Sequence, residues 1–132
     1  YEALSKIEEV DIVGHIDLLT KFDEQGSFFQ PDSSRFLKAA LEAVDVLIAA
    51  GKIFEINTGA ISRGYRTTPY PSAMLLREIV RRGGRITVSA DAHRAQDVTC
   101  QFAESEALAR ACGATELWQF NGKGFEPIPI GG

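Results

Sequence analysis

The sequence contains little cysteine, little histidine and no excess of basic residues. Its 132 residues include two cysteines and two histidines, and 18 acidic residues outnumber 14 basic ones, for a formal net charge of -4. Domains that bind nucleic acids usually carry a basic surface, and no cluster of lysines and arginines here is long enough to form one. The composition therefore predicts no nucleic-acid partner.

Long apolar runs and a secretory leader are also missing. No apolar run approaches the roughly 20 residues needed to cross a bilayer, and no basic segment followed by an apolar one opens the sequence. We therefore expect no membrane association and no secretion.

The two cysteines are too far apart for a disulfide. Cys100 and Cys112 fall within or at the end of one predicted helix, and twelve helical residues rise about 18 Å, which exceeds disulfide reach. The sequence therefore predicts reduced thiols in a cytoplasmic protein. It also lacks the closely spaced cysteine pair of a zinc finger, and Cys112 is expected to pack as a small apolar residue.

What the sequence does contain is an alternation of apolar strands and amphipathic helices. Strand patterns cover residues 10–16, 52–57, 85–89 and 116–120, and helix patterns cover residues 34–50, 73–82 and 97–111. This order is typical of the α/β class, in which parallel strands alternate with helices that cover the sheet. Periodicity alone allows either a barrel or an open sheet.

The chain has the size and apolar content of one domain, with 45% hydrophobic residues. We expect a single unit over residues 1–132. The chain starts at Tyr1 and not at methionine, and residues 2–9 have the pattern of the end of a helix. The sequence is therefore expected to be a fragment or a processed chain.

Polar residues that can bind metals or transfer protons follow the predicted strands. The first strand ends in Gly14-His15-Ile16-Asp17, the second in Glu55-Ile56-Asn57 and the third in Asp91-Ala92-His93. Because the carboxyl ends of parallel strands lie at one rim, these groups are expected to face the same site. Asp-x-His presents a carboxylate and an imidazole together, a combination suited to Zn, Mn or Fe and to activating water.

Structural explanations also exist for these residues. Asp91 can cap a turn, and His93 can be a surface or hydrogen-bonded core histidine. His15 can bond a backbone carbonyl, and Asp17 can cap the next turn. Both histidines nevertheless occur at strand ends, although 78 residues separate them in the chain. We therefore favour shared metal binding by His15, Asp91 and His93, although three ligands leave a multinuclear site incomplete.

Several further side chains have two interpretations. Glu55 can bond a backbone amide and Asn57 can shape a turn, or both can act in the site. Arg63 and Arg66 can bind a phosphate through bidentate hydrogen bonds, but solvated loop arginines are common and are the favoured interpretation here. Lys21 lies beyond a strand end, which slightly favours an anion contact over a surface position.

Four motifs together resemble the polymerase and histidinol phosphatase (PHP) superfamily, and within it the histidinol-phosphatase branch. The motifs are Val13-Gly14-His15-Ile16-Asp17-Leu18; Glu55-Ile56-Asn57-Thr58-Gly59 followed by Tyr70-Pro71-Ser72; Ser89-Ala90-Asp91-Ala92-His93 followed by Asp97-Val98; and Phe125-Glu126-Pro127-Ile128-Pro129-Ile130. The match covers nearly the whole chain but only the C-terminal half of such an enzyme.

The resemblance implies a distorted (β/α)7 TIM-like barrel with a three-metal cluster at its C-terminal rim, and hydrolysis of L-histidinol phosphate in histidine biosynthesis. By resemblance, His15, Asp91 and His93 are ligands of divalent metal ions, Asp91 also helps proton transfer, and Lys21 contacts the substrate phosphate. The family's usual Ser-Asp-Ala-His appears here as Ser-Ala-Asp-Ala-His, which keeps the ligand pair.

The main departure from the family is an absence. Family members begin with a His-x-His motif and supply further His and Glu ligands before the matched region, and this chain contains none of them. A partial barrel leaves strand edges unpaired, so we expect association with the missing N-terminal half or with a second copy. Two alternatives are another PHP phosphoesterase and a non-catalytic partial-barrel binding module.

Overall fold

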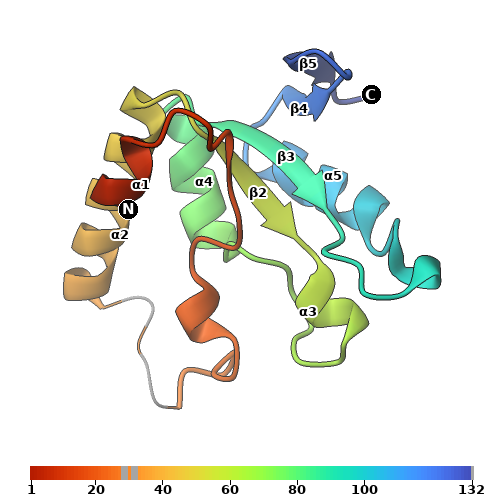
Figure 1. Ribbon diagram of the computed structural model, residues 1–132. Coiled ribbons are helices and arrows are strands. Elements are labelled where there is room, and N and C mark those ends of the chain that lie inside the picture. Colours follow the sequence, from red (N-terminus) through yellow and green to blue (C-terminus); the bar gives the residue numbers. More distant parts are fainter. Residues whose placement is uncertain (28–29, 31–32, 132) are drawn as a thin grey trace.

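The computed structural model describes residues 1–27, 30 and 33–131. Helices and strands alternate along the chain (Figure 1). In order they are α1 (Glu2–Ser5), β1 (Ile12–Val13), the 3-10 helix η1 (Leu18–Thr20), α2 (Ser34–Ala49), β2 (Ile53–Asn57), α3 (Gly59–Ser62), α4 (Ala73–Arg81), β3 (Arg85–Ser89), the 3-10 helix η2 (Ala95–Asp97), α5 (Phe102–Ala111), β4 (Glu116–Phe120) and β5 (Phe125–Pro129).

The first three strands form a parallel sheet in the order β1-β2-β3. The register places Val13 beside Phe54 and Asn57 beside Ser89, so the carboxyl ends of the strands meet at one edge. The predicted α/β class with parallel strands is confirmed. The sheet is open, with β1 and β3 at its edges, and the barrel implied by the resemblance stays a prediction.

The hydrophobic core lies between the sheet and the helices. The apolar positions of α2 and α4 recur every three or four residues, which places them on the one face of each helix that meets the sheet. The most buried members are Val44, Leu47, Phe54, Ile56, Leu75, Leu76, Ile79 and Ile86. Cys112 belongs to the same core, as the sequence predicted.

A buried lysine holds β1 against the rest of the sheet. The Lys52 ammonium donates hydrogen bonds to the carbonyl oxygens of Ile7 and Val10, each over 2.7 Å. The side chain of Lys52 therefore fixes the segment that enters β1, which itself is only two residues long.

Two predicted boundaries are wrong. The first strand was expected over residues 10–16 but covers only Ile12–Val13, because the chain leaves the sheet at Gly14 and turns sharply at His15. The helix expected from Asp97 begins at Phe102, because Gln101 adopts a left-handed backbone conformation (φ 58°) that a continuous helix does not allow. Cys100 therefore precedes the helix.

The last strand does not join the parallel sheet. β4 pairs with β5 in an antiparallel hairpin at the upper right of Figure 1, and Leu117 of β4 packs against the core. The sequence predicted β4 but not β5, whose two prolines are tolerated because a two-stranded hairpin has free edges. The Arg85 guanidinium lies 4.4 Å from the Trp118 ring centroid and connects β3 to this hairpin. In the described ranges, no helix has both the length and the apolar character required to span a bilayer.

Candidate functional site

A polar pocket of about 380 Å³ lies at the carboxyl ends of the parallel strands. Its walls include side chains from segments that are far apart in the sequence. They are His15, Lys21, Arg63, Tyr70, Asp91 and His93. The pocket therefore contains all four residues that the sequence predicted for the site, namely Lys21, His15, Asp91 and His93.

The backbone is strained at two of these residues. His15 and Asp91 each lie two residues beyond a strand end, and they have positive φ angles of 30° and 44°. Residues other than glycine rarely adopt such angles, and they persist only where surrounding contacts hold them. Strain of this kind is concentrated at functional sites, so its occurrence on two sides of one pocket supports the location of the site.

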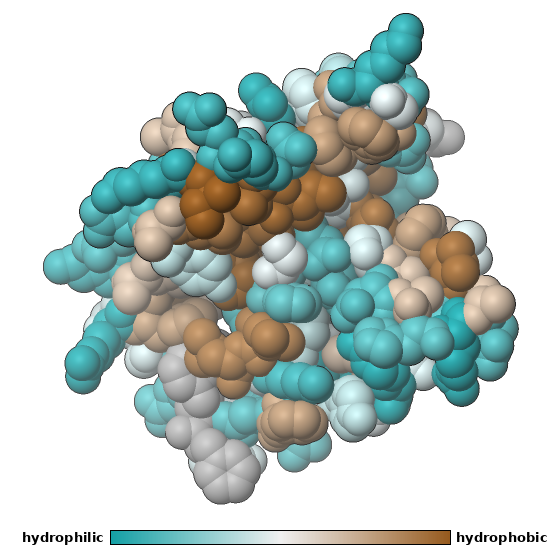
Figure 2. All heavy atoms as spheres, viewed as in Figure 1, coloured by the Kyte–Doolittle hydropathy of each residue, from teal (hydrophilic) through white to brown (hydrophobic). Residues whose placement is uncertain are grey.

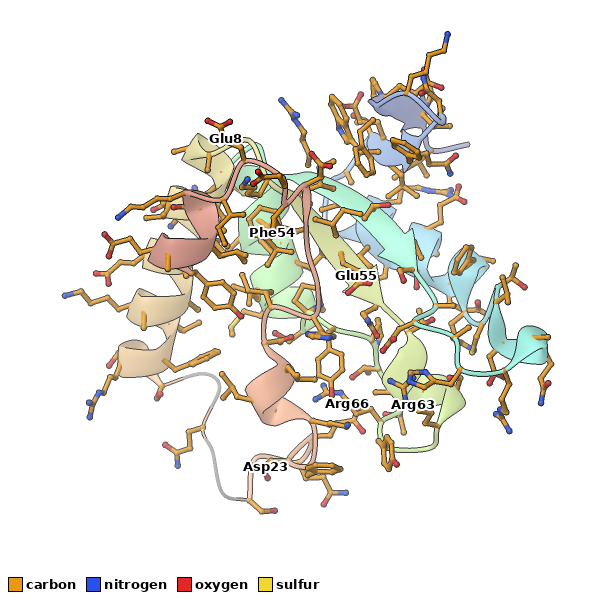
Figure 3. All side chains as sticks on the ribbon, viewed as in Figure 1. Glu8, Asp23, Phe54, Glu55, Arg63 and Arg66 are labelled. Atoms are coloured by element: carbon orange, nitrogen blue, oxygen red, sulfur yellow. The ribbon has the colours of Figure 1, made fainter. Side chains whose placement is uncertain are left out.

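Glu55 fixes the backbone of His15. The Glu55 Oε2 atom accepts a hydrogen bond from the His15 amide nitrogen over 3.0 Å and another from Asn57 Nδ2 over 3.0 Å. A side chain at Gly14 would come within 3.1 Å of this oxygen, so glycine leaves room for the carboxylate. Figure 3 shows Glu55 on β2. Of its two interpretations, the bond to a backbone amide is observed, and a role in the site stays a prediction.

Asn57 shapes the turn that follows β2. Its Oδ1 atom accepts a hydrogen bond from the Gly59 amide over 3.0 Å, and its backbone forms an isolated bridge with Tyr70. This bridge brings the loop that carries Arg63 and Tyr70 back over the strand ends. Of the two interpretations of Asn57, shaping the turn is observed, and a role in the site stays a prediction.

Arg63 joins the two polar residues after β3. Its Nη2 atom lies 2.9 Å from Asp91 Oδ2, and its Nη1 atom donates to the Asp91 carbonyl oxygen over 2.9 Å. The same Nη1 atom lies 2.9 Å from His93 Nδ1. Figure 3 shows Arg63 beside α3. The expectation of a solvated loop arginine is wrong for Arg63, because this network holds its side chain in the pocket wall.

The Arg63 network also sets the charge of Asp91. Burial alone would raise the pKa of the Asp91 carboxyl, but the hydrogen bond and positive charge of Arg63 outweigh burial and hold this pKa below its usual range. The Asp91 carboxylate is therefore ionised at neutral pH, with its oxygens available as hydrogen-bond or proton acceptors.

Gly59 makes the contact between Arg63 and Asp91 possible. A side-chain carbon at position 59 would lie 2.8 Å from Arg63 Nη2 and 2.8 Å from the Asp91 Cβ atom. Atoms cannot approach so closely without moving the neighbours. Glycine at this position therefore lets the guanidinium lie between α3 and the end of β3.

Lys21 lies in the pocket wall between two aromatic rings. Its Nζ atom is 5.1 Å from the ring centroid of Phe22 and 5.0 Å from that of Tyr65. These distances allow cation–π attraction, which holds the ammonium near the pocket while leaving its N–H donors free to bind a ligand. The position agrees with the anion contact predicted for Lys21 and does not test it.

Arg66 has a different position from Arg63. It is 8% exposed, its Nη1 atom donates to the carbonyl and hydroxyl oxygens of Thr20, and its guanidinium stacks 4.6 Å from the Tyr70 ring centroid. The expectation of a solvated loop arginine is therefore wrong for Arg66 as well. It ties the loop before Tyr70 to η1 and contributes a fixed positive charge next to the pocket.

Asp17 does not cap the turn that follows it. Its Oδ2 atom instead accepts a hydrogen bond over 2.8 Å from the amide nitrogen of Ser72, the residue before α4. The carboxyl group is buried, and burial raises its pKa despite the hydrogen bond from Ser72 and the charge of Arg66. Asp17 therefore connects the His15 segment to α4.

The described residues do not form a closed metal site. Across residues 1–27, 30 and 33–131, no group of three or more His, Cys, Asp and Glu side chains is placed so that it could hold a metal ion. Arg63 also contacts both Asp91 and His93. A metal would need further ligands from outside the described residues and a shift of the Arg63 side chain.

The fold and the pocket define an α/β chain with a polar site at the carboxyl ends of its parallel strands. No family model matches the chain. Over 118 residues it is 28% identical to a protein of Schizosaccharomyces pombe named "Probable histidinol-phosphatase", and the match covers 89% of this chain. The chain spans 38% of the length of that relative. It is therefore similar to part of that protein.

Sequence reasoning did not assign Tyr70 a role, and it did not anticipate the network of Arg63. Both residues lie on the loop between β2 and α4, whose position depends on the bridge between Asn57 and Tyr70. The one local signal was the glycine at position 59. A glycine can indicate that neighbouring groups approach the backbone closely, but it does not show that these groups are Arg63 and Asp91.

Proposed function

We propose that this chain is part of a metal-dependent phosphomonoesterase, and that the substrate is L-histidinol phosphate, an intermediate of histidine biosynthesis. The observation that carries the proposal is the pocket that His15, Asp91 and His93 line together with the cationic side chains of Lys21 and Arg63. The similarity to a protein named as a histidinol-phosphatase supports the same activity.

The charges of the pocket suit a phosphate group. Lys21 and Arg63 each bring one positive charge, Arg66 lies behind the wall, and Asp91 is the ionised acid. Among the residues that line the pocket, the two cations therefore exceed the one anion. In the proposed complex, Lys21 donates hydrogen bonds to the phosphoryl oxygens, and Arg63 turns part of its guanidinium from Asp91 towards them.

Asp91 serves as the proton acceptor in this proposal. A phosphomonoester is hydrolysed when water adds to phosphorus and the bond to the alcohol oxygen breaks. The attacking water must lose a proton, and the released alcohol oxygen must gain one. The Asp91 carboxylate lines the pocket and is ionised at neutral pH, so it can accept this proton. Its lowered pKa makes it a weaker base than an ordinary aspartate, and turning Arg63 towards the phosphate would raise this pKa and strengthen the base.

The metal ions of the proposal are Zn, Mn or Fe, with His15, Asp91 and His93 as ligands and the remaining ligands outside these 132 residues. Bound metals would neutralise phosphoryl charge and lower the pKa of water. The residues described here position the phosphate and accept the proton.

Phosphate release by the full-length natural polypeptide tests the proposal. We expect it to release phosphate from L-histidinol phosphate, to lose activity with a chelator and to regain activity with Zn, Mn or Fe. Asp91→Asn should lower kcat by a factor of about 100 or more, because removing a positioned acid–base group has an effect of this size. His93→Ala should also lower kcat, because it removes a proposed metal ligand. Elemental analysis of the same samples should show less bound metal in His93→Ala.

Asp97→Asn is the matched control. Asp97 is the next acidic residue after Asp91, it pairs with Arg94 over 2.8 Å, and it lies outside the pocket walls. Its substitution should leave kcat within about twofold. An unsubstituted protein that binds no metal and releases no phosphate would overturn the proposal and favour the non-catalytic binding module. Activity on other phosphomonoesters alone would favour a different phosphoesterase.

The proposal includes association with an N-terminal segment. β1 is an edge strand, so one side of its backbone can pair with a further strand. Figure 2 shows hydrophobic residues gathered near the middle of the face seen in Figure 1, with hydrophilic residues around them. We expect the isolated chain to associate with a separately produced N-terminal segment or with itself, and a clean monomer by analytical ultracentrifugation at high concentration would contradict this.

A further inference from the structure

Two large aromatic side chains lie exposed beside the phosphate pocket. Phe22 follows η1 and is 75% exposed, and Tyr65 lies in the loop after α3 and is 50% exposed. Their ring centroids are 5.7 Å apart and the rings are nearly perpendicular, at 83°. Apolar ring surface in contact with water is unfavourable in free energy, and a bound apolar group would cover part of this surface.

These two rings form part of the wall of a second hollow. It has a volume of about 370 Å³, and the rest of its wall is made by Asp23, Glu24, Gln25, Ser27 and Gly64. Tyr65 also lines the phosphate pocket, so the two hollows share this side chain as a common wall. The second hollow therefore adjoins the phosphate pocket at Tyr65.

Two aromatic side chains favour a ligand group that is itself a planar aromatic ring. Aromatic side chains attract other aromatic rings through edge-to-face and offset-stacked contacts, beyond the attraction due to buried area alone. A saturated ring of the same size buries similar area but lacks the flat face and the ring charge distribution. The pair of Phe22 and Tyr65 offers one edge and one face in a nearly perpendicular arrangement.

From this arrangement we infer that Phe22 and Tyr65 bind the planar ring of the alcohol part of a phosphomonoester whose phosphate lies beside Lys21. The inference rests on the proposed function and adds the residues that select the substrate. Lys21 lies between the two subsites, because its ammonium is near both rings and in the wall of the phosphate pocket.

A pair of substrates of matched size separates ring recognition from phosphate recognition. The probes are benzyl phosphate, whose ring is planar, and cyclohexylmethyl phosphate, whose ring is puckered and saturated. Hydrolysis of both is measured with the full-length natural polypeptide. We expect a lower KM for benzyl phosphate by about three- to tenfold, with similar kcat, as aromatic contacts of this kind produce.

Four variants test the assignment. Phe22→Leu and Tyr65→Leu should each bring the KM ratio close to one by raising the KM for benzyl phosphate alone. Tyr65→Phe keeps the ring and should keep the ratio. Phe120→Leu is the matched control, because Phe120 is 62% exposed on β4 and lies in the wall of neither hollow.

Each alternative outcome has a distinct meaning. If the enzyme is active but Phe22→Leu and Tyr65→Leu leave the ratio of the two KM values unchanged, the ring subsite is overturned and the proposed function stands. A rise in KM for both probes in Phe22→Leu and Tyr65→Leu would show that the rings only hold Lys21, which also overturns the subsite. Hydrolysis of neither probe nor of histidinol phosphate would overturn the proposed function and the subsite with it.

Discussion

The Arg63 guanidinium bridges Asp91 and His93, with 2.9 Å from Nη2 to Asp91 Oδ2 and 2.9 Å from Nη1 to His93 Nδ1. The bridge joins the loop after β2 to the loop after β3 at the place where the parallel strands end. The geometry of the two predicted metal ligands after β3 therefore depends on a side chain that approaches from another strand.

Substituting Arg63 with lysine should loosen this bridge. Lysine keeps the positive charge, but its single nitrogen cannot reach the Asp91 carboxylate, the Asp91 carbonyl and His93 with the fixed fork of a guanidinium. We expect Arg63→Lys to lower the free energy of unfolding by about 1 kcal/mol in urea titrations. Arg77→Lys, on α4 and outside the pocket walls, is the control. Equal stability of Arg63→Lys and the original protein would show that the bridge contributes little.

Adding a methyl group at position 59 should displace Arg63. The new carbon would lie 2.8 Å from both Arg63 Nη2 and the Asp91 Cβ atom. We expect Gly59→Ala to lower the free energy of unfolding by about 1 to 3 kcal/mol, the usual cost of overpacking. Gly124→Ala, where no atom lies within 4 Å of the added carbon, should change stability by less than about 0.5 kcal/mol. Calorimetry of the two variants provides the comparison.

The stability of the loop at residues 67–68 should depend on the protonation of Glu24. Its carboxylate accepts hydrogen bonds from the amides and hydroxyls of Thr67 and Thr68 over 2.6 to 3.1 Å. Burial alone would raise the pKa of Glu24, but these hydrogen bonds hold it below the ordinary value of 4.5. A carboxyl group with a lowered pKa in the folded state stabilises that state above its unfolded pKa and loses the contribution as pH falls through the folded pKa.

We therefore expect the contribution of Glu24 to be complete at pH 7 and to decline below pH 4.5. Glu24→Gln should lower the free energy of unfolding at pH 7 by about 1 kcal/mol and flatten the decline at acid pH. Glu42→Gln, on the exposed face of α2, is the control. Urea titrations at pH 7 and pH 3.5 measure both effects, and an equal acid dependence in Glu24→Gln and the original protein would contradict the assignment.

Removing the Tyr70 hydroxyl should not destabilise the protein. The side chain is 1% exposed, and among the described residues its hydroxyl oxygen has no hydrogen-bond partner. An unpaired buried hydroxyl costs free energy, so Tyr70→Phe is expected to keep or raise the melting temperature. Tyr70→Leu, which loses the ring beneath Arg66, should lower stability by about 2 kcal/mol or more. A marked fall in the melting temperature of Tyr70→Phe would indicate a hydrogen bond to a group outside these residues.

Much of the fold could be predicted from the sequence, because the signals are local. The strand at Arg85–Ser89 was predicted with its observed bounds, and the helices at Ser34–Ala49 and Ala73–Arg81 agree with their apolar spacing and their glycine ends. The hairpin of β4 and β5 was missed, because the two prolines of β5 conceal its strand pattern.

The site could be predicted only in part. The positions of His15, Asp91 and His93 around one pocket follow from their places after parallel strands. The partners of Arg63 and Arg66 could not be predicted, because they depend on how a loop folds back over the sheet. An arginine in a polar loop has the same sequence signature whether it is solvated or buried in a hydrogen-bond network.

The two-residue β1 makes the His15 side of the pocket the easiest to open. Strand β2 lies between two neighbours, whereas β1 depends on a short edge pairing and on the Lys52 ammonium that binds the carbonyls before it. Amide hydrogens around His15 should therefore exchange with solvent sooner than those of β2 and β3. A strand from an N-terminal segment that paired with β1 would slow this exchange. Pairing at this edge would then also make the His15 side of the pocket more rigid.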